Sequence, residues 1–135
     1  RMTVNELSAQ AEFKALTMPD GEREITGVYI GDLLSWVMGR AKADCAWITI
    51  MSNINIVAVA SLADTACIIL AESVELPEDV VATATQKNVN ILTSELGAYE
   101  IACKLNELIL TNTTTTFTFT PACRPAGTTT RRLQT

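Results

Sequence analysis

The chain has 135 residues, 48% of them hydrophobic, which suits a single domain with a substantial core. No segment reaches the roughly 18 apolar residues that a membrane helix needs, and the N-terminus lacks a signal-sequence pattern, so we expect a cytoplasmic protein. Residues 1–110 carry all 15 acidic groups but only seven of the ten basic ones, a net charge of −8, which disfavours nucleic acids as partners; with no membrane helix, we expect no membrane partner either.

The N-terminal part of the chain predicts one helix and two strands. Thr3 and Glu6 have the spacing of a capping box, which predicts a short helix at about residues 3–11. The segment EFKALT (12–17) is a candidate strand. The segment ITGVYI (25–30) alternates β-branched and aromatic residues, as strands do.

From residue 32 onward, helical and extended patterns alternate along the chain. Helices are predicted at residues 32–40, 53–64, 77–88 and 94–110, and strands at 45–50, 66–71 and 89–93. These strands are continuously apolar rather than alternating, which indicates a parallel sheet covered by helices on both faces. The predicted fold class is therefore α/β, a three-layer α/β/α sandwich with a mostly parallel sheet of four to five strands.

Residues 111–135 break this pattern, so we divide the chain into an α/β domain at 1–110 and a tail at 111–135. Eleven of the 25 tail residues are threonine. Consecutive threonines arise when a histidine-tag codon run is read one base out of frame, and PACRPAG resembles translated cloning sites, so the favoured interpretation is a non-native sequence. The alternative is a natural extension, in which TTTTFTFT (113–120) adds a β-strand to a sheet.

The loops that follow the carboxyl ends of parallel strands are where ligands of open sheets bind. In the first such loop, Gly31 permits a sharp turn, and Asp32 is expected to cap the helix that begins at Leu33. A carboxylate at this helix end would repel a phosphate, so we interpret Gly31-Asp32 as structural rather than as a phosphate-binding turn.

Three later loops supply the predicted ligand-binding residues. The loop MSNIN (51–55) has only uncharged side chains, and no acid follows until Asp64, which leaves the dipole of the next helix uncompensated. The loops at 71–73 and 93–95 follow the next two strands and add further polar groups. The predicted ligand-binding residues are Ser52, Asn53, Asn55, Glu72, Ser73 and Ser94. Helix capping alone is the competing interpretation.

The residue types argue against catalysis. Histidine is missing, which removes the commonest general base and metal ligand, and the four cysteines form no C-x-x-C pair. Neither Gly-rich phosphate-binding motif occurs. We therefore predict no metal, no cofactor and no catalytic residue; the alternative is a small enzyme that uses Glu72, Glu95 and Ser52.

The segment LLSWVM (33–38) is apolar on nearly every side of its expected helix, with only Ser35 polar. A helix of this kind is buried all round, whereas a helix on one face of a small sheet keeps a wet side. Tryptophan and methionine are enriched in interface centres. We expect a homodimer or higher homo-oligomer, with an unusually closed monomer as the alternative. The predicted interface residues are Leu33, Leu34, Trp36, Val37 and Met38.

The stretch from ITGVYIGDLL to AYEIACKL (25–105) resembles the DRTGG domain family, specifically its short stand-alone bacterial members. The resemblance covers about residues 3–108, excludes the tail, and rests on the order and spacing of whole segments. It implies a three-layer α/β fold. Related domains occur in phosphotransacetylases, in regulatory pyrophosphatases between nucleotide-binding CBS modules, and at the N-terminus of HPr kinase/phosphorylase. Because catalytic residues lie in other domains there, the resemblance implies a regulatory or dimerising module.

The chain departs from the family pattern at two turns. Where longer members carry a Gly-Asp-Arg-type turn it has Met51-Ser52-Asn53, and where they carry Gly-Gly it has Glu72-Ser73. These differences weaken any ligand role based on the family's own residues. The predicted function is a non-enzymatic regulatory or oligomerisation module that senses a small molecule or nucleotide at the strand-to-helix loops. A scaffold that docks another protein through the helix at 33–38 is the alternative.

Overall fold

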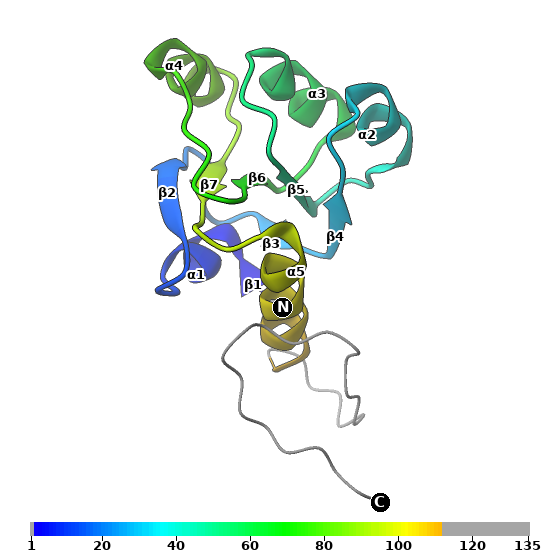
Figure 1. Ribbon diagram of the computed structural model, residues 1–135, viewed down its shortest axis with the longest axis vertical. Coiled ribbons are helices and arrows are strands. Elements are labelled where there is room, and N and C mark those ends of the chain that lie inside the picture. The colour runs from blue at the N-terminus through cyan, green and yellow to red at the C-terminus, as the bar shows by residue number, and fades with distance from the viewer. Residues whose placement is uncertain (1, 112–135) are drawn as a thin grey trace, which may run out of the picture.

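A five-stranded sheet forms the middle of the computed structural model, which describes residues 2–111 (Figure 1). In chain order the strands are β2 (Lys14–Thr17), β4 (Gly27–Ile30), β5 (Cys45–Thr49), β6 (Cys67–Leu70) and β7 (Ile91–Thr93). Their order in the sheet is β2-β7-β6-β5-β4, with β2 antiparallel to β7 and all other neighbours parallel. The predicted strand at 113–120 and the origin of the tail lie outside the described residues.

Helices cover both faces of this sheet, which confirms the predicted α/β sandwich (Figure 1). One face carries α2 (Leu34–Arg40), α3 (Asn55–Ala63) and α4 (Glu78–Gln86). The other face carries α1 (Val4–Ser8) and α5 (Ala98–Thr111). A small antiparallel pair, β1 (Met2–Thr3) with β3 (Glu24–Ile25), lies beside α1.

The two central strands supply residues to two separate cores. Ala46 and Ile48 of β5 pack toward α1 and α5, whereas Trp47 between them packs toward α2, α3 and α4. The same alternation holds in β6, where Ile68 and Ile69 face opposite cores and are both fully buried. Each such side chain contributes about 1.5–3 kcal/mol through burial of apolar surface, so continuous apolar strands are what this architecture requires.

The first helix begins with the predicted capping box. The Glu6 backbone N–H donates to Thr3 Oγ1 at 3.1 Å, and the Thr3 N–H donates to Glu6 Oε1 at 2.9 Å. Val4 and Leu7 turn inward and are fully buried. The sequence signal for this helix is therefore correct at its start, although the helix ends at Ser8 rather than near residue 11.

The single strand predicted at residues 25–30 is wrong in one respect, because the chain divides at Thr26. Residues before this point form β3, which pairs with β1, and residues after it form β4, which joins the main sheet. The Thr26 N–H donates to the Asp44 carbonyl at 2.9 Å instead of to a strand neighbour.

The predicted role of Asp32 as a helix cap is also wrong. Helix α2 begins at Leu34, with Leu33 in an extended conformation at the N-cap position and no side-chain cap. Asp32 Oδ1 instead accepts hydrogen bonds from Thr49 Oγ1 at 2.7 Å and from the Ile50 N–H at 3.0 Å. The carboxylate therefore ties the β4–α2 loop to the end of β5.

Polar side chains hold the loops at the amino ends of the strands. Arg23 Nε donates to Asp44 Oδ1 at 2.9 Å, and its Nη2 donates to Asp64 Oδ1 at 2.7 Å. Burial lowers the pKa of Arg23, but the hydrogen bonds and charges of Asp64 and Asp44 outweigh this effect and raise it.

Between residues 2 and 111, no helix is long and apolar enough to cross a membrane.

Asn90, at the base of β7, holds a turn against the sheet. Its Oδ1 accepts from the Asp20 N–H at 2.9 Å, and its Nδ2 donates to the carbonyls of Asp20 at 2.8 Å and Ala66 at 2.9 Å. The Asn90 side chain is almost fully buried, so these groups have no ready replacement by water.

We expect Asn90→Ala to lower the free energy of unfolding by about 2 kcal/mol, because it leaves buried polar groups unsatisfied. Urea unfolding followed by circular dichroism measures this change. The control is Asn106→Ala, a half-buried position in α5 that we expect to change stability by less than about 0.5 kcal/mol. Equal effects of the two substitutions would contradict the structural role of Asn90.

Candidate functional site

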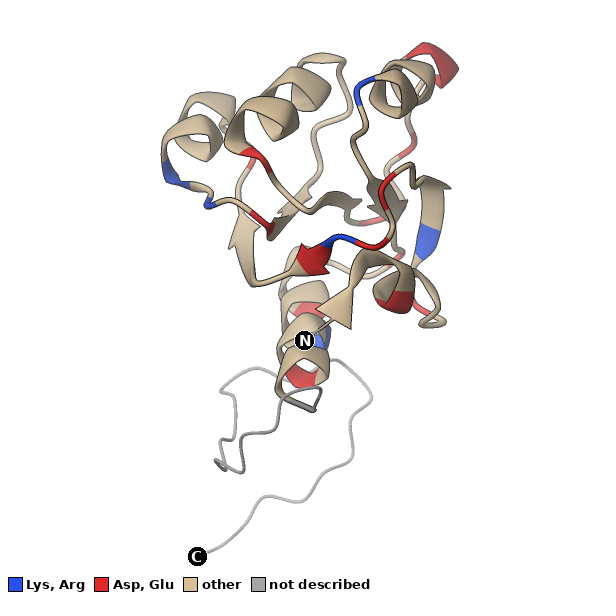
Figure 2. Cartoon of the chain, turned by 180° about the vertical axis from the view of Figure 1, so that it is seen from behind, with Lys and Arg blue, Asp and Glu red and all other residues tan. Residues whose placement is uncertain are grey.

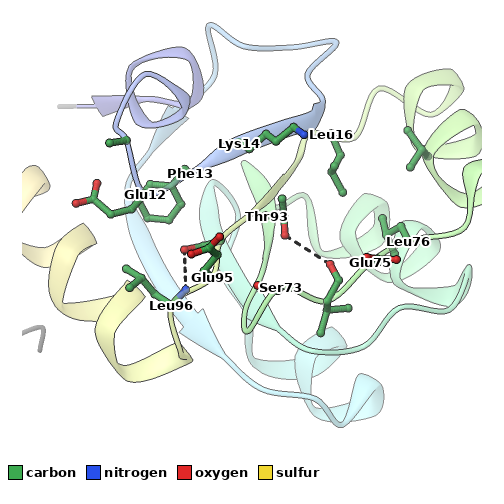
Figure 3. Close-up of a pocket in the computed structure, with 14 residues that line it drawn as sticks. Glu12, Phe13, Lys14, Leu16, Ser73, Glu75, Leu76, Thr93, Glu95 and Leu96 are labelled. Atoms are coloured by element: carbon green, nitrogen blue, oxygen red, sulfur yellow. Dashed lines mark hydrogen bonds between the residues drawn. The ribbon is translucent and has the colours of Figure 1, made fainter.

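A pocket of about 730 Å³ opens at the carboxyl edge of β7, and we call it the edge pocket (Figure 3). Four chain segments surround it: the start of β2 with the residues before it, the β6–α4 loop, helix α4 through Val81, and the end of β7 with the β7–α5 loop. Its lining consists of Ala11, Glu12, Phe13, Lys14, Leu16, Ser73, Val74, Glu75, Leu76, Val81, Thr93, Ser94, Glu95 and Leu96. The volume falls in the range of about 300–1,000 Å³ that is typical of small-molecule sites.

The antiparallel direction of β2 creates one wall of the edge pocket. Because β2 runs opposite to β7, the first residue of β2 lies where β7 ends, and Lys14 pairs with Thr93. The segment that precedes β2 therefore reaches the edge of the sheet at which the parallel strands release their loops. Glu12 and Phe13 enter the lining in this way.

Two backbone hydrogen bonds hold the β6–α4 and β7–α5 loops side by side. The Glu72 N–H donates to the Leu96 carbonyl at 2.8 Å, and the Ser73 N–H donates to the Ser94 carbonyl at 2.8 Å. The loops therefore form one continuous surface at the edge of the sheet.

The same two loop residues have an unusual backbone conformation. Glu72 has a φ of 59° and Ser73 a φ of 60°, in the left-handed region that favours glycine. Each such residue costs on the order of 1–3 kcal/mol and persists only where the surroundings enforce it, as the two cross-loop hydrogen bonds do here.

The lining combines an apolar floor with hydroxyl and charged groups (Figure 3). Ser94 is almost fully buried, and its Oγ accepts the Leu96 N–H at 3.1 Å. Thr93 Oγ1 lies 3.5 Å from the Val74 carbonyl. Glu12 forms an ion pair with Lys104 of α5, with 3.4 Å between Oε2 and Nζ. The arrangement suits recognition of a small ligand by shape and by a few polar contacts.

A family comparison now identifies the chain, since the model of the DRTGG domain matches residues 14–108, well over half of its length. The chain belongs to the DRTGG domain family. The resemblance seen in the sequence is thereby confirmed. No curated protein matches the sequence.

Among solved structures, this DRTGG domain is similar to the CBS and DRTGG domains of the regulatory region of Clostridium perfringens pyrophosphatase, complexed with the activator diadenosine tetraphosphate. The TM-score is 0.53 and the sequence identity is 12%. The match covers 69% of this chain and 40% of the pyrophosphatase chain. At this identity the similarity shows a shared fold.

The edge pocket contains some of the residues that the sequence predicts for ligand binding. Ser73 and Ser94 line it, and Glu72 is adjacent but is not among the lining residues. Ser52 and Asn53 belong to the β5–α3 loop, Asn55 is the first residue of α3, and none of the three lines the pocket; the Asn53 Oδ1 accepts the Asn55 N–H at 2.9 Å. The structure thus separates the predicted residues into two groups.

The wall contributed by residues 11–16 was missing from the sequence prediction. The strand itself was recognised at 12–17, but nothing local in a sequence specifies which neighbour a strand pairs with or in which direction. The sequence signal for an edge position is the place of this strand in the chain, after α1 and before the series of parallel strands.

The alternative enzyme prediction needs three side chains in one place. Glu95 lines the edge pocket, Glu72 lies beside it, and Ser52 lies in another loop, so the structure does not unite them in one lining. Across residues 2–111, no group of three or more metal-binding side chains is placed to hold a metal ion.

The predicted interface helix has two distinct sides. Leu33, Trp36 and Met38 are about half exposed, at 59%, 52% and 50%. Leu34 is half-buried against the core, and Val37 is fully buried within it. Val37 was expected at the subunit interface, and the structure corrects this because α2 uses Val37 to pack on its own sheet.

We expect Ser73→Val to lower the free energy of unfolding by about 1–3 kcal/mol, because a β-branched residue fits the left-handed conformation poorly. Urea unfolding measures this change. Ser73→Gly is the matched control and should cause no loss, since glycine adopts this conformation without steric cost. A stable Ser73→Val variant would show that the loop conformation differs from the one described.

Proposed function

We propose that this DRTGG domain is a non-catalytic regulatory module that binds a small molecule in the edge pocket. The observation that carries the proposal is the pocket itself, which lies at the strand-to-helix edge where open α/β sheets bind ligands. An apolar floor with a few polar groups is the usual composition of such sites.

The family comparison supports regulation rather than catalysis. The similar Clostridium perfringens structure is a regulatory region, and it was determined with an activator. In the described part of this chain, the side chains that an enzyme would need are divided among three loops, and Ser52 lies away from the pocket lining. A small enzyme that uses Glu72, Glu95 and Ser52 is therefore the weaker explanation.

The proposal predicts where small molecules bind. In a fragment screen followed by two-dimensional ¹H–¹⁵N NMR of the full chain, we expect shifted amide signals to cluster at residues 11–16, 73–76 and 93–96. Leu76→Trp, which places a larger side chain in the pocket, should weaken these fragments by about tenfold or more by occluding their site.

Asn53→Asp is the control, because it adds a negative charge at the β5–α3 loop and leaves the edge pocket untouched. It should not change fragment binding. Shifts centred on residues 52–55, together with loss of binding in Asn53→Asp, would move the ligand site to the β5–α3 loop. No clustered shifts from any fragment would refute the proposed function.

Self-association is a second proposed property, and a different surface supports it. Leu33, just before α2, and Trp36 and Met38 within it are about half exposed. Val28 and Ile30 of β4 are exposed at the same edge of the sheet (Figure 1), but on the face opposite to α2, because their partners Ala46 and Ile48 face α1 and α5. Isolated exposed apolar side chains are ordinary, but large ones gathered at one edge are typical of interaction sites.

The edge strand β4 favours a second copy of the chain as the partner. In the described sheet, β4 is the last strand and pairs only with β5, so its outer backbone groups are available. Two copies can pair such strands antiparallel about a twofold axis, which places both α2 helices at the same contact. The Arg40 guanidinium lies 3.7 Å from the centroid of the Trp36 ring and adds a polar rim.

We expect the full chain to be a dimer or higher oligomer in light scattering, and Trp36→Glu to shift it to monomer because a charge enters the apolar contact. Tyr99→Glu is the control, since Tyr99 is similarly exposed on α5. It should leave the mass unchanged. If the wild type is a monomer, or if folded Trp36→Glu keeps the mass of the wild type, self-association through this surface is contradicted. A different protein would then be the expected partner of this surface.

A further inference from the structure

The backbone groups that usually bind anions are already occupied at the edge pocket. Phosphate sites in α/β folds use free N–H groups of Gly-rich loops and of helix N-termini. Here the N–H groups of Glu72 and Ser73 donate to the carbonyls of Leu96 and Ser94 at 2.8 Å. The β6–α4 turn therefore has no free donor at these two residues.

The two helices that begin beside the pocket are compensated by acidic side chains. Helix α4 has Pro77 at its N-cap and Glu78 and Asp79 in its first turn. At the start of α5, Glu100 lies in the first turn, and its Oε1 accepts the Gly97 N–H at 3.2 Å. Since carboxylates already occupy the positive ends of both helix dipoles, neither end favours an incoming phosphate.

The charged groups of the lining are predominantly acidic. Three carboxylates, those of Glu12, Glu75 and Glu95, line the pocket together with the single ammonium group of Lys14. Glu12 forms the ion pair with Lys104, and in Figure 3 its carboxylate points away from the other labelled groups. Within the described residues, Glu75 and Glu95 form no ion pair.

The surroundings of the pocket have the same sign. Acidic positions outnumber basic ones across the described elements (Figure 2), in agreement with the net charge of −8 for residues 1–110. A ligand with several phosphates would approach against this potential, whereas a cation would approach along it.

We infer that the edge pocket binds a small amphipathic cation, with an ammonium-type head group at one of the two exposed carboxylates, Glu75 or Glu95, which lie apart in the lining (Figure 3), and an apolar body on the floor. Phe13, Leu16 and Val81 supply apolar surface for that body. The hydroxyl oxygens of Ser73 and Thr93 add hydrogen-bond acceptors for the N–H groups of the head. This inference rests on the proposed function, because it assigns a ligand class to the same pocket, and it disfavours the nucleotide among the ligands that the sequence predicts.

Three probes with one carbon skeleton test the sign of the charge: 3-phenylpropylamine, 3-phenylpropan-1-ol and 3-phenylpropanoate. Titration of the full chain, followed by ¹H–¹⁵N NMR, measures an apparent Kd from the pocket amides. We expect the amine to bind about three- to tenfold more tightly than the alcohol, and the carboxylate to bind most weakly. Added salt should weaken the amine and leave the alcohol unchanged, because it screens only charged groups.

Variants distinguish the effect of the two pocket carboxylates on amine binding from the effect of the overall negative charge. Glu75→Gln combined with Glu95→Gln should weaken the amine about three- to tenfold without changing the affinity of the alcohol. Both side chains are exposed, so the folded state should persist, and the alcohol titration verifies this. Glu78→Gln is the control, since it removes one negative charge nearby but outside the lining.

The outcomes distinguish this inference from the proposed function. Equal binding of amine and alcohol in the pocket, tighter binding of the carboxylate, or an unaltered amine Kd in the double variant would overturn the cation assignment and leave the pocket in place. If all three probes and the fragment screen left the pocket amides unshifted, both proposals would fall. If Glu78→Gln lost as much amine affinity as the double variant, the overall negative charge of the domain would explain the effect, and the assignment to Glu75 or Glu95 would be overturned.

Discussion

Burial of the two central strands on both faces is the constraint on which the rest of this fold depends. Because β5 and β6 lie between two helical layers, every side chain along them faces one core or the other, as Trp47 and Ile48 illustrate. The side chains of such strands are therefore not accessible to solvent or to a ligand. Thr49, the last residue of β5, is the polar exception, and its hydroxyl is used to hold Asp32. Chemistry is therefore confined to loops and edge strands.

The two edges of the sheet meet this constraint in different ways. At one edge the antiparallel strand β2 brings Lys14 beside Thr93 and completes a pocket. At the other edge the parallel strand β4 leaves Val28 and Ile30 exposed on the face of the sheet opposite to α2. Strands β5, β6 and β7 separate these surfaces. A ligand in the pocket would not touch a second copy bound at β4, so any linkage between the two must pass through the sheet.

The sequence predicted what depends on local pattern. Continuous apolar strands and helix periodicity gave the three layers, and the Thr3–Glu6 spacing gave the first cap. Ser73 and Ser94 come together in one lining because parallel strands end at a common edge, and their binding role stays a prediction. The failures depend on distant partners. Asp32 has a strong local preference for capping, but the Thr49 hydroxyl, 17 positions away, holds it instead. Likewise, no local sequence pattern predicts that β2 pairs antiparallel with β7.

The pairing of β2 with β7 also has a consequence for how the molecule folds. The contacts between these strands, like the bonds from Asn90 to Asp20 across 70 positions, join the start of the domain to its last strand. Closing so long a loop is entropically slow compared with formation of the consecutive β–α units. During synthesis the N-terminal segment must wait for β7 to emerge, so we expect the edge pocket to be completed last. Release of this one strand would dismantle the pocket while the parallel sheet persists, and an occupant would hold the two ends of the domain together.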